Sequence, residues 1–340
     1  MNIRQFLEDP TVFGVNKLAP RTASWPSSRI EIGDDDFLYD VADWRLCLND
    51  AWHFRWFPDV PPAPDGFEQP SFDDSGWNTI DLPANWECLG FGTPLYSNYT
   101  YPFPSDPPRI STPAPADWTT AREPNPTARL RRRLILPENW AGRLVRLAFG
   151  GAQTALMVWC NGAFVGYSED SMGVAEFDLT DKLQPGENTI ALEICKYSSA
   201  SYLEDQDFWR LSGIFRDVFL YAVDPKHLVD AAIHADALTG TISAEVELSP
   251  AAQDCTVELH CRGRVATLPH AIILDAFQLW NAETPFLYTV SLVLRDADGI
   301  RDIRHFRTGF RTEAIRDGVF YLNDVPIKLR GVNRHEHDPQ

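Results

Sequence analysis

The chain has 340 residues, of which 44% are hydrophobic and 23% charged, a composition typical of globular proteins. Its formal net charge of −18 would repel nucleic-acid phosphates and anionic lipid head groups, so we expect neither nucleic acid nor a membrane as a partner. No stretch reaches the roughly 20 apolar residues of a membrane span, and the first residues lack a signal-peptide pattern, so the sequence favours a cytoplasmic protein.

The six cysteines show no pattern of a disulfide framework or a metal site. They form no CxxC pair, and several lie inside apolar patterns such as LMVWC and ALEIC. Free cysteines are among the most buried residues of globular proteins. We therefore predict that most of them are reduced core residues; they are Cys47, Cys88, Cys160, Cys195, Cys255 and Cys261.

Residues 1–43 show no sustained hydrophobic periodicity. They include the proline- and serine-containing NKLAPRTASWPSS and the acidic GDDDF. We expect an extended N-terminal arm here.

Short apolar or alternating runs separated by turn residues fill residues 44–223. Asn161 and Gly162 stand between two apolar runs, which is the strongest short-range signal for a tight hairpin. A later Pro-Gly turn precedes a strand that alternates, with Ile190 and Leu192 on one face. The pattern predicts an all-β domain of two packed sheets, in the manner of a jelly roll.

A second set of strands follows Asp224 and Pro225, a natural boundary. The run GTISAEVELSP alternates, with Ile242 and Val246 among the inward residues. Several alternating strands within 224–312 are typical of a small immunoglobulin-like sandwich. The Cys and Trp spacing of antibody domains is missing, so only the architecture is predicted.

The last part, residues 313–340, is predicted to contain a hairpin that turns at Asn323 and Asp324. Its second strand runs into the segment IKLRGVN and then into a cluster of histidines. If IKLRGVN is the first strand of a (β/α)8 barrel, the residues after it lie at the face where barrel active sites are built.

The histidine cluster HEHDP first indicates a metal site. A zincin needs HExxH on a helix, but the position four after His335 is Pro339, which excludes that motif. His335 and His337 would lie on the same side of a strand, so a metal site completed by residues elsewhere stays open.

The stretch SYLEDQDFWRLSGIFRDV combines carboxylates with aromatic rings, which suits the hydroxyl groups and C–H faces of a sugar. The carboxylates are Glu204, Asp205 and Asp207. A structural alternative is a loop held by pairs between these carboxylates and Arg210 or Arg216. Residue chemistry leaves both open.

The stretch GTPLYSNYTYPFP places Tyr96, Tyr99 and Tyr101 around Asn98. An asparagine among aromatic rings can bind a sugar hydroxyl, or the loop can simply cap the edge of a sandwich. Chemistry alone does not decide.

Taken together, these motifs resemble the large bacterial β-galactosidases of glycoside hydrolase family 2, over nearly the whole chain beyond the arm. The motifs that carry this resemblance are NWECLGFGTPLYSNYTYPFP, WCNGAFVGYSEDS, EFDLTDKLQPGEN, SYLEDQDFWRLSGIFRDV, LWNAETPFLYTV and LRGVNRHEHDP. The resemblance implies a mainly β fold: a jelly-roll sugar-binding domain, then an immunoglobulin-like β-sandwich, then the first strand of a truncated (β/α)8 barrel. The implied activity is hydrolysis of terminal β-D-galactose, with retention, from a β-galactoside such as lactose.

The resemblance also implies residue roles. Asn98 looks like the jelly-roll residue that reaches the galactose site, and Tyr99 beside it lines the pocket. Asp207 is similar to the residue that contacts a galactose hydroxyl and ligates a sodium ion. His335 is similar to the barrel histidine that hydrogen-bonds the sugar as the transition state forms.

The family's acid/base and nucleophile glutamates, and its magnesium ligands, would lie beyond Gln340 by this resemblance. We therefore expect a truncated chain that is catalytically incomplete alone, with Asp207 as its only metal ligand, for sodium. The resemblance implies a homo-oligomer for the full-length protein. Two alternatives stay open: a noncatalytic carbohydrate-binding module, and another family 2 hydrolase such as a β-glucuronidase or β-mannosidase.

Overall fold

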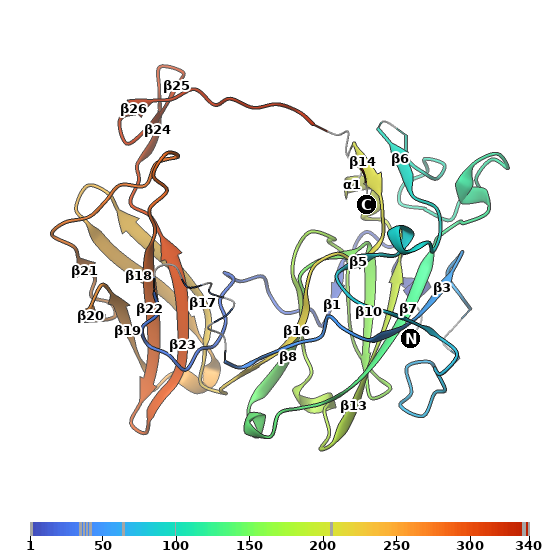
Figure 1. The fold of residues 1–340 in the computed structure, drawn as a ribbon, viewed down its shortest axis with the longest axis horizontal. Helices are drawn as coiled ribbons and strands as arrows, with labels where there is room; N and C mark the ends of the chain where they lie inside the picture. Colours follow the sequence, from blue (N-terminus) through green and yellow to red (C-terminus); the bar gives the residue numbers. More distant parts are fainter. Residues whose placement is uncertain are drawn as a thin grey trace.

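The computed structural model describes residues 3–33, 36, 38, 40, 43–62, 65–98, 100–204, 207–334 and 338. Antiparallel strands in two lobes dominate it (Figure 1), so the predicted mainly β architecture is confirmed. Among the described residues, no helix is long and apolar enough to cross a membrane. The helices are α1 (Ser201–Glu204) and the 3-10 helices η1 (Ile3–Gln5), η2 (Trp86–Leu89), η3 (Thr119–Ala121), η4 (Glu138–Trp140), η5 (Thr180–Lys182) and η6 (Pro250–Ala252).

The first lobe packs a seven-stranded sheet against a four-stranded sheet. The larger sheet has the order β1 (Gly14–Val15), β11 (Ala163–Ser168), β10 (Ala155–Cys160), β13 (Glu187–Cys195), β7 (Thr127–Ile135), β3 (Trp52–Phe57), β4 (Asn78–Ile80). The smaller sheet has the order β12 (Ala175–Asp178), β8 (Leu144–Phe149), β16 (Val218–Val223), β2 (Arg45–Cys47).

One apolar core lies between these two sheets. Ile190 and Leu192 of β13 face Leu147 of β8 and Leu220 of β16 within it, all with no exposed surface. Alternate positions of each strand point into the core, as the sequence pattern predicted for β13. This is the packing expected of a jelly-roll domain.

The hairpin predicted at Asn161 and Gly162 is present between β10 and β11. Both residues have positive φ, 51° and 82°, as a two-residue turn with matching twist requires. A Cβ at Gly162 would also lie 2.5 Å from the Gln69 Oε1 atom. Glycine is therefore favoured here by the backbone conformation, since the exposed Gln69 side chain could move away from a Cβ.

The N-terminal arm covers the outer faces of both sheets. Ile3 and Leu7 pack with Met157 and Trp159, which point away from the main core of the larger sheet. Further along, Trp25 packs on the outer face of the four-stranded sheet. The arm thus buries faces that a sheet in contact with solvent would leave exposed, which the sequence did not predict.

The second lobe is also a two-sheet sandwich. Its three-stranded sheet has the order β17 (Leu228–Asp236), β18 (Thr241–Leu248), β21 (Ile272–Ile273), and its four-stranded sheet β20 (Arg264–Thr267), β19 (Thr256–Cys261), β22 (Tyr288–Asp296), β23 (Gly299–Thr308). Ile242 and Val246 point toward a core that includes Leu292. The predicted immunoglobulin-like architecture is confirmed.

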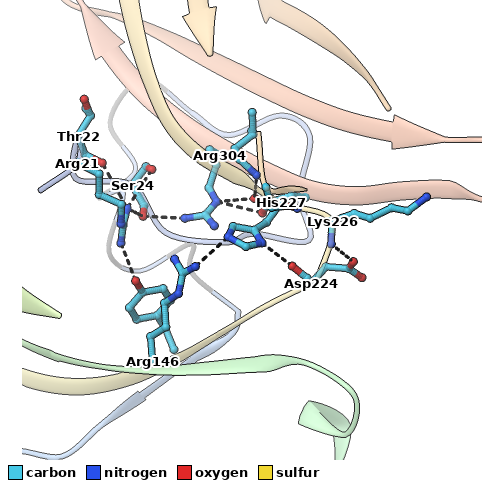
Figure 2. Close-up of polar contacts among 12 residues, drawn as sticks. Arg21, Thr22, Ser24, Arg146, Asp224, Lys226, His227 and Arg304 are labelled. Atoms are coloured by element: carbon cyan, nitrogen blue, oxygen red, sulfur yellow. Dashed lines mark hydrogen bonds and ion pairs between the residues drawn. The ribbon is translucent and has the colours of Figure 1, made fainter. Parts of the chain in front are cut away.

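Buried polar contacts join the two lobes (Figure 2). Between the lobes, His227 Nε2 lies 2.9 Å from Arg146 Nη2 of β8, and its Nδ1 lies 2.8 Å from the Asp224 carbonyl oxygen. Arg304 of β23 donates to the carbonyl oxygen of Ser24 in the arm, at 2.9 Å. The arm and the inter-lobe linker therefore act together as the joint.

The hairpin predicted at Asn323 and Asp324 is present, with φ of 51° and 62°. It belongs to a small sheet of β24 (Glu313–Arg316), β25 (Val319–Leu322) and β26 (Val325–Pro326). The barrel strand expected from Ile327 onward does not form over the described residues 327–334, where the ladder ends at Pro326. A barrel strand needs neighbours to satisfy its backbone; here the Ile327 N–H donates to the Phe320 carbonyl oxygen of β25 at 2.9 Å, and no strand ladder continues beyond Pro326 among the described residues.

Two small sheets lie at one edge of the first lobe. One joins β6 (Leu95–Ser97) to β14 (Phe208–Arg210), and the other has the order β5 (Ala84–Asn85), β15 (Gly213–Ile214), β9 (Ala152–Gln153). Cys160, Cys195 and Cys261 are buried, whereas Cys47 is exposed and Cys88 and Cys255 are half-buried, so the prediction that most of the six cysteines are core residues is correct for only half of them.

Candidate functional site

The candidate site lies at the end of the β6–β14 ladder. Antiparallel pairing sets Ser97 opposite Phe208 and Tyr96 opposite Trp209. Asn98 follows Ser97 and Asp207 precedes Phe208, so both lie at the same end of the ladder. The fold thus brings together two predicted site residues that come from motifs far apart in the sequence.

Tyr96 orients the Asp207 carboxylate. Its phenol Oη donates a hydrogen bond to Asp207 Oδ1. The Tyr96 ring packs edge-on against Trp209, with ring centroids 5.8 Å apart. Asp207 is half-buried and Asn98 exposed, so a ligand from solvent can reach both side chains. A carboxylate fixed by a phenol and an adjacent amide form a polar pair suited to sugar hydroxyls.

A buried ion pair holds the chain that follows β14. Lys196 Nζ lies 2.6 Å from Glu87 Oε1, and both side chains are at most 2% exposed. The same carboxylate accepts hydrogen bonds from the Ser212 backbone N–H, at 2.9 Å, and from its hydroxyl, at 2.6 Å. Arg210 of β14 donates to the Ser97 carbonyl oxygen at 3.2 Å. These contacts fix the ladder that carries Asp207.

The pairing of Lys196 with Glu87 could not be predicted from the sequence. Lys196 follows the apolar strand β13, and nothing local to it indicates a partner in η2. Pairs of this kind become visible only when the fold brings distant segments together. The glutamate in NWECLG stands between a tryptophan and a cysteine, and that apolar setting is the one local signal of its burial.

Part of the acidic stretch has a structural role, but Glu204 is held by a serine and not by Arg216, as the structural alternative had it. Glu204 accepts hydrogen bonds from the backbone N–H and the hydroxyl of Ser171, at 2.7 and 2.6 Å, which fastens α1 to a neighbouring loop. Arg216 donates to the carbonyl oxygens of Gly150 and Met172, at 3.1 and 2.7 Å. Glu204 therefore has a structural role, and Asp205 lies outside the described residues.

Tyr99, His335 and His337 also lie outside the described residues. The segment Ile327–Arg334 leads from the β24–β26 sheet of one lobe toward β14 and β6 of the other (Figure 1). The pKa of the Cys88 thiol in η2 is raised by burial, by the Glu87 carboxylate and, as the smallest of the three causes, by the Asp338 carboxylate. Asp338 therefore lies near Cys88. The described residues on both sides of His335 thus approach the edge of the lobe that carries the candidate site.

The described residues contain no group of three or more His, Cys, Asp or Glu side chains that could hold a metal ion. Asp207 can offer a carboxylate oxygen, the ligand type that hard cations prefer. A sodium ion there would need its remaining oxygen ligands from other groups.

Comparison with known proteins settles the family. Residues 46–224 match the family described as "Glycosyl hydrolases family 2, sugar binding domain". The chain belongs to glycosyl hydrolase family 2. Residues 226–311 also match "Glycosyl hydrolases family 2". The resemblance inferred from the motifs is therefore confirmed.

The relatives of this family 2 chain are longer proteins. It is 39% identical to a β-galactosidase of Photobacterium profundum, over 87% of this chain and 30% of the relative. It is 36% identical to a β-galactosidase of Priestia megaterium, over 97% of this chain and 34% of that relative. A solved structure of Bacteroides uniformis β-glucuronidase 2 has a TM-score of 0.64 at 25% identity, covering 86% of this chain and 35% of that one. The chain spans about a third of the length of these relatives.

Proposed function

We propose that this family 2 chain forms the galactose-binding rim of a β-galactosidase, which hydrolyses terminal β-D-galactose with retention. The observation that carries the proposal is that Asn98 and Asp207 lie at the same end of the β6–β14 ladder, with Tyr96 bonded to the Asp207 carboxylate. The similarity to curated β-galactosidases at 36–39% identity supports the substrate.

In this proposal Asp207 accepts hydrogen bonds from galactose hydroxyls, and Asn98 supplies an amide donor or acceptor beside it. Tyr96 keeps the carboxylate oriented through its phenol hydrogen bond. Tyr99 is a further pocket residue, and His335 binds the sugar as the transition state forms. Contacts of this kind raise the rate when they strengthen toward the oxocarbenium-like transition state.

The metal part of the proposal is confined to one ligand. Asp207 would supply one carboxylate oxygen to a sodium ion, and no residue of this chain is assigned to the magnesium ion that the resemblance implies. A hard cation there would partly neutralise the carboxylate and polarise the bound hydroxyl groups.

A β-glucuronidase is the competing function, because solved β-glucuronidases share the fold. A glucuronide carries a carboxylate on its sugar ring. On a sugar held by Asp207, that group would lie within the length of one sugar ring of the Asp207 carboxylate, and the whole chain has a net charge of −18. Repulsion between like charges favours a neutral sugar here, so galactose is the better candidate.

We further propose that the 340 residues alone do not hydrolyse galactosides. Retaining hydrolysis needs two carboxylates about 5–5.5 Å apart across the scissile bond. At the candidate site Asp207 is the one carboxylate that the resemblance assigns to the sugar. Turnover of nitrophenyl β-galactoside by this chain at the uncatalysed background rate is the expected result, and turnover well above it would contradict this part.

The binding test compares galactose with glucuronate by saturation-transfer NMR titration of the chain. We expect galactose to bind and glucuronate to bind at least tenfold more weakly. Asp207→Asn removes a charge-assisted acceptor worth about 1.5–3 kcal/mol, so its galactose affinity should fall by about tenfold or more. Asp181→Asn, an exposed carboxylate of η5, is the matched control and should bind like the parent.

Two results would contradict the proposal. Tighter binding of glucuronate than of galactose would favour the β-glucuronidase. Unchanged galactose affinity in Asp207→Asn would remove Asp207 from the sugar site.

A further inference from the structure

A shallow groove lies beside the candidate site, between β6 and the loop that leads into η3. Its lining includes Tyr96, Ser97, Tyr101, Asp117 and Trp118. Its volume is about 270 Å³, just below the roughly 300–1,000 Å³ of pockets for drug-sized ligands. The groove therefore has room for one sugar ring rather than for a longer chain.

The groove presents aromatic rings to solvent. Tyr96 is 47% exposed and Trp118 is 38% exposed, although both are large side chains that burial would stabilise. The exposed carboxylate of Asp117 lies next to Trp118 in the lining. Rings for the C–H face of a sugar and an acceptor for its hydroxyls thus occur in one place.

The backbone around Trp118 is fixed. The Trp118 N–H donates to the Pro115 carbonyl oxygen at 2.9 Å, and the Trp118 carbonyl accepts from the Ala121 N–H at 3.1 Å. In η3, the buried Thr120 donates its hydroxyl to the Pro102 carbonyl oxygen at 2.6 Å. The backbone that carries Trp118 is therefore ordered, which lowers the entropy lost on binding.

Tyr96 connects the groove to the candidate site. Its ring lines the groove, and its Oη donates to Asp207. Ser97 and Thr100, which also line the groove, flank Asn98 in the chain. A sugar held by Asn98 and Asp207 and a ligand in the groove would thus be neighbours.

We propose that this groove is a subsite for the second sugar residue of a β-galactoside, with Trp118 as the stacking platform and Asp117 as a hydroxyl acceptor. This inference rests on the proposed function, because it places the galactose residue at Asn98 and Asp207. The predicted consequence is a preference for a disaccharide over free galactose.

The test compares lactose with galactose in NMR titrations of the chain and of Trp118 variants. The parent chain should bind lactose about five- to tenfold more tightly than galactose. In Trp118→Ala the two affinities should become equal, with galactose affinity unchanged. Trp118→Phe keeps an aromatic face and should retain most of the preference for lactose.

Phe13→Ala is the matched control, because Phe13 is 69% exposed and is absent from the groove lining. It should leave both affinities unchanged, and circular dichroism checks that every variant is folded.

The possible failures are distinct. If galactose binds but Trp118→Ala keeps the full preference for lactose, the subsite is overturned and the proposed function stands. If the parent binds lactose and galactose equally, the subsite is also overturned. If galactose does not bind the parent at all, the proposed function fails, and the subsite fails with it.

Discussion

At the scale of single residues, burial decides how the ionisable groups behave. His305 of β23 is 3% exposed, and its Nδ1 lies 2.8 Å from the Ser291 hydroxyl of β22. Burial is the main cause that lowers its pKa from 6.5 to about 4, with Arg29 acting in the same direction. A backbone hydrogen bond at Arg29 and the Asp43 carboxylate oppose the shift. His305 is therefore neutral in the folded protein at neutral pH.

Because its pKa is lowered, we expect His305 to make the folded protein less stable in acid. Its pKa is lower when folded, so the unfolded chain binds more protons below pH 6.5, and the stability present above that pH is lost toward pH 4. The free energy of unfolding in urea should fall by about 1.4 kcal/mol per pH unit there from this residue. His305→Gln should flatten that slope relative to the parent.

The exposed His234, whose side chain is 56% accessible, supplies the control. His234→Gln should leave the slope of the parent unchanged. If His305→Gln also left it unchanged, the acid sensitivity would not come from His305. The buried His227, whose pKa is lowered by burial and by Arg146, contributes with the same sign.

At the scale of elements, the sequence predicted features whose cause is local. The turn at Asn161 and Gly162 and the alternation of β13 are both present, because turn conformation and strand periodicity depend on neighbouring residues. Ala191 on the other face of β13 is buried in a cluster that includes the distant arm residues Ile3 and Leu7, so no local pattern reveals its burial.

The candidate site, too, could be predicted from the sequence only in part. Asn98 and Asp207 could be identified as candidates from the sequences of their motifs. Their position at the same end of one ladder follows from the pairing of β6 with β14. The role of Trp118 could not be predicted, because its exposure and its closeness to Tyr96 arise only in the folded chain.

The arm also fastens the proline-rich loop ahead of η3. Glu8 Oε1 accepts hydrogen bonds from the backbone N–H groups of Ile110 and Ser111, both at 2.8 Å. Glu8→Ala would remove the one oxygen that accepts both hydrogen bonds, at a cost of about 1–2 kcal/mol. We expect faster hydrogen–deuterium exchange in peptides covering Ile110 and Ser111, measured by mass spectrometry.

Asp9→Ala is a suitable control for the Glu8 prediction. Among the described residues, the Asp9 carboxylate bonds within its own turn, to the N–H and the hydroxyl of Thr11. Exchange in the loop should stay at the parent rate in this variant. Equal acceleration in both variants would mean that the arm as a whole, and not the Glu8 carboxylate, orders the loop.

At the scale of the whole molecule, the two lobes are joined by charges buried between them (Figure 2). Arg304 is 1% exposed and donates to Ser24 of the arm and, at 2.9 Å, to Asp302 Oδ2. Asp302 also accepts from the Leu228 N–H at 3.0 Å, where the second lobe begins. The joint therefore links the arm, the linker and β23 through one buried ion pair.

Arg304→Met should uncouple the lobes. It leaves the Asp302 carboxylate buried without its cation, which typically costs about 3–5 kcal/mol. We expect calorimetry to show separate transitions for the two lobes, and small-angle X-ray scattering to show a larger radius of gyration. Arg295→Met is the control, because Arg295 is 33% exposed in its pair with Glu258 and should cost about 1 kcal/mol or less. Equal effects of both substitutions would show that the joint does not depend on Arg304.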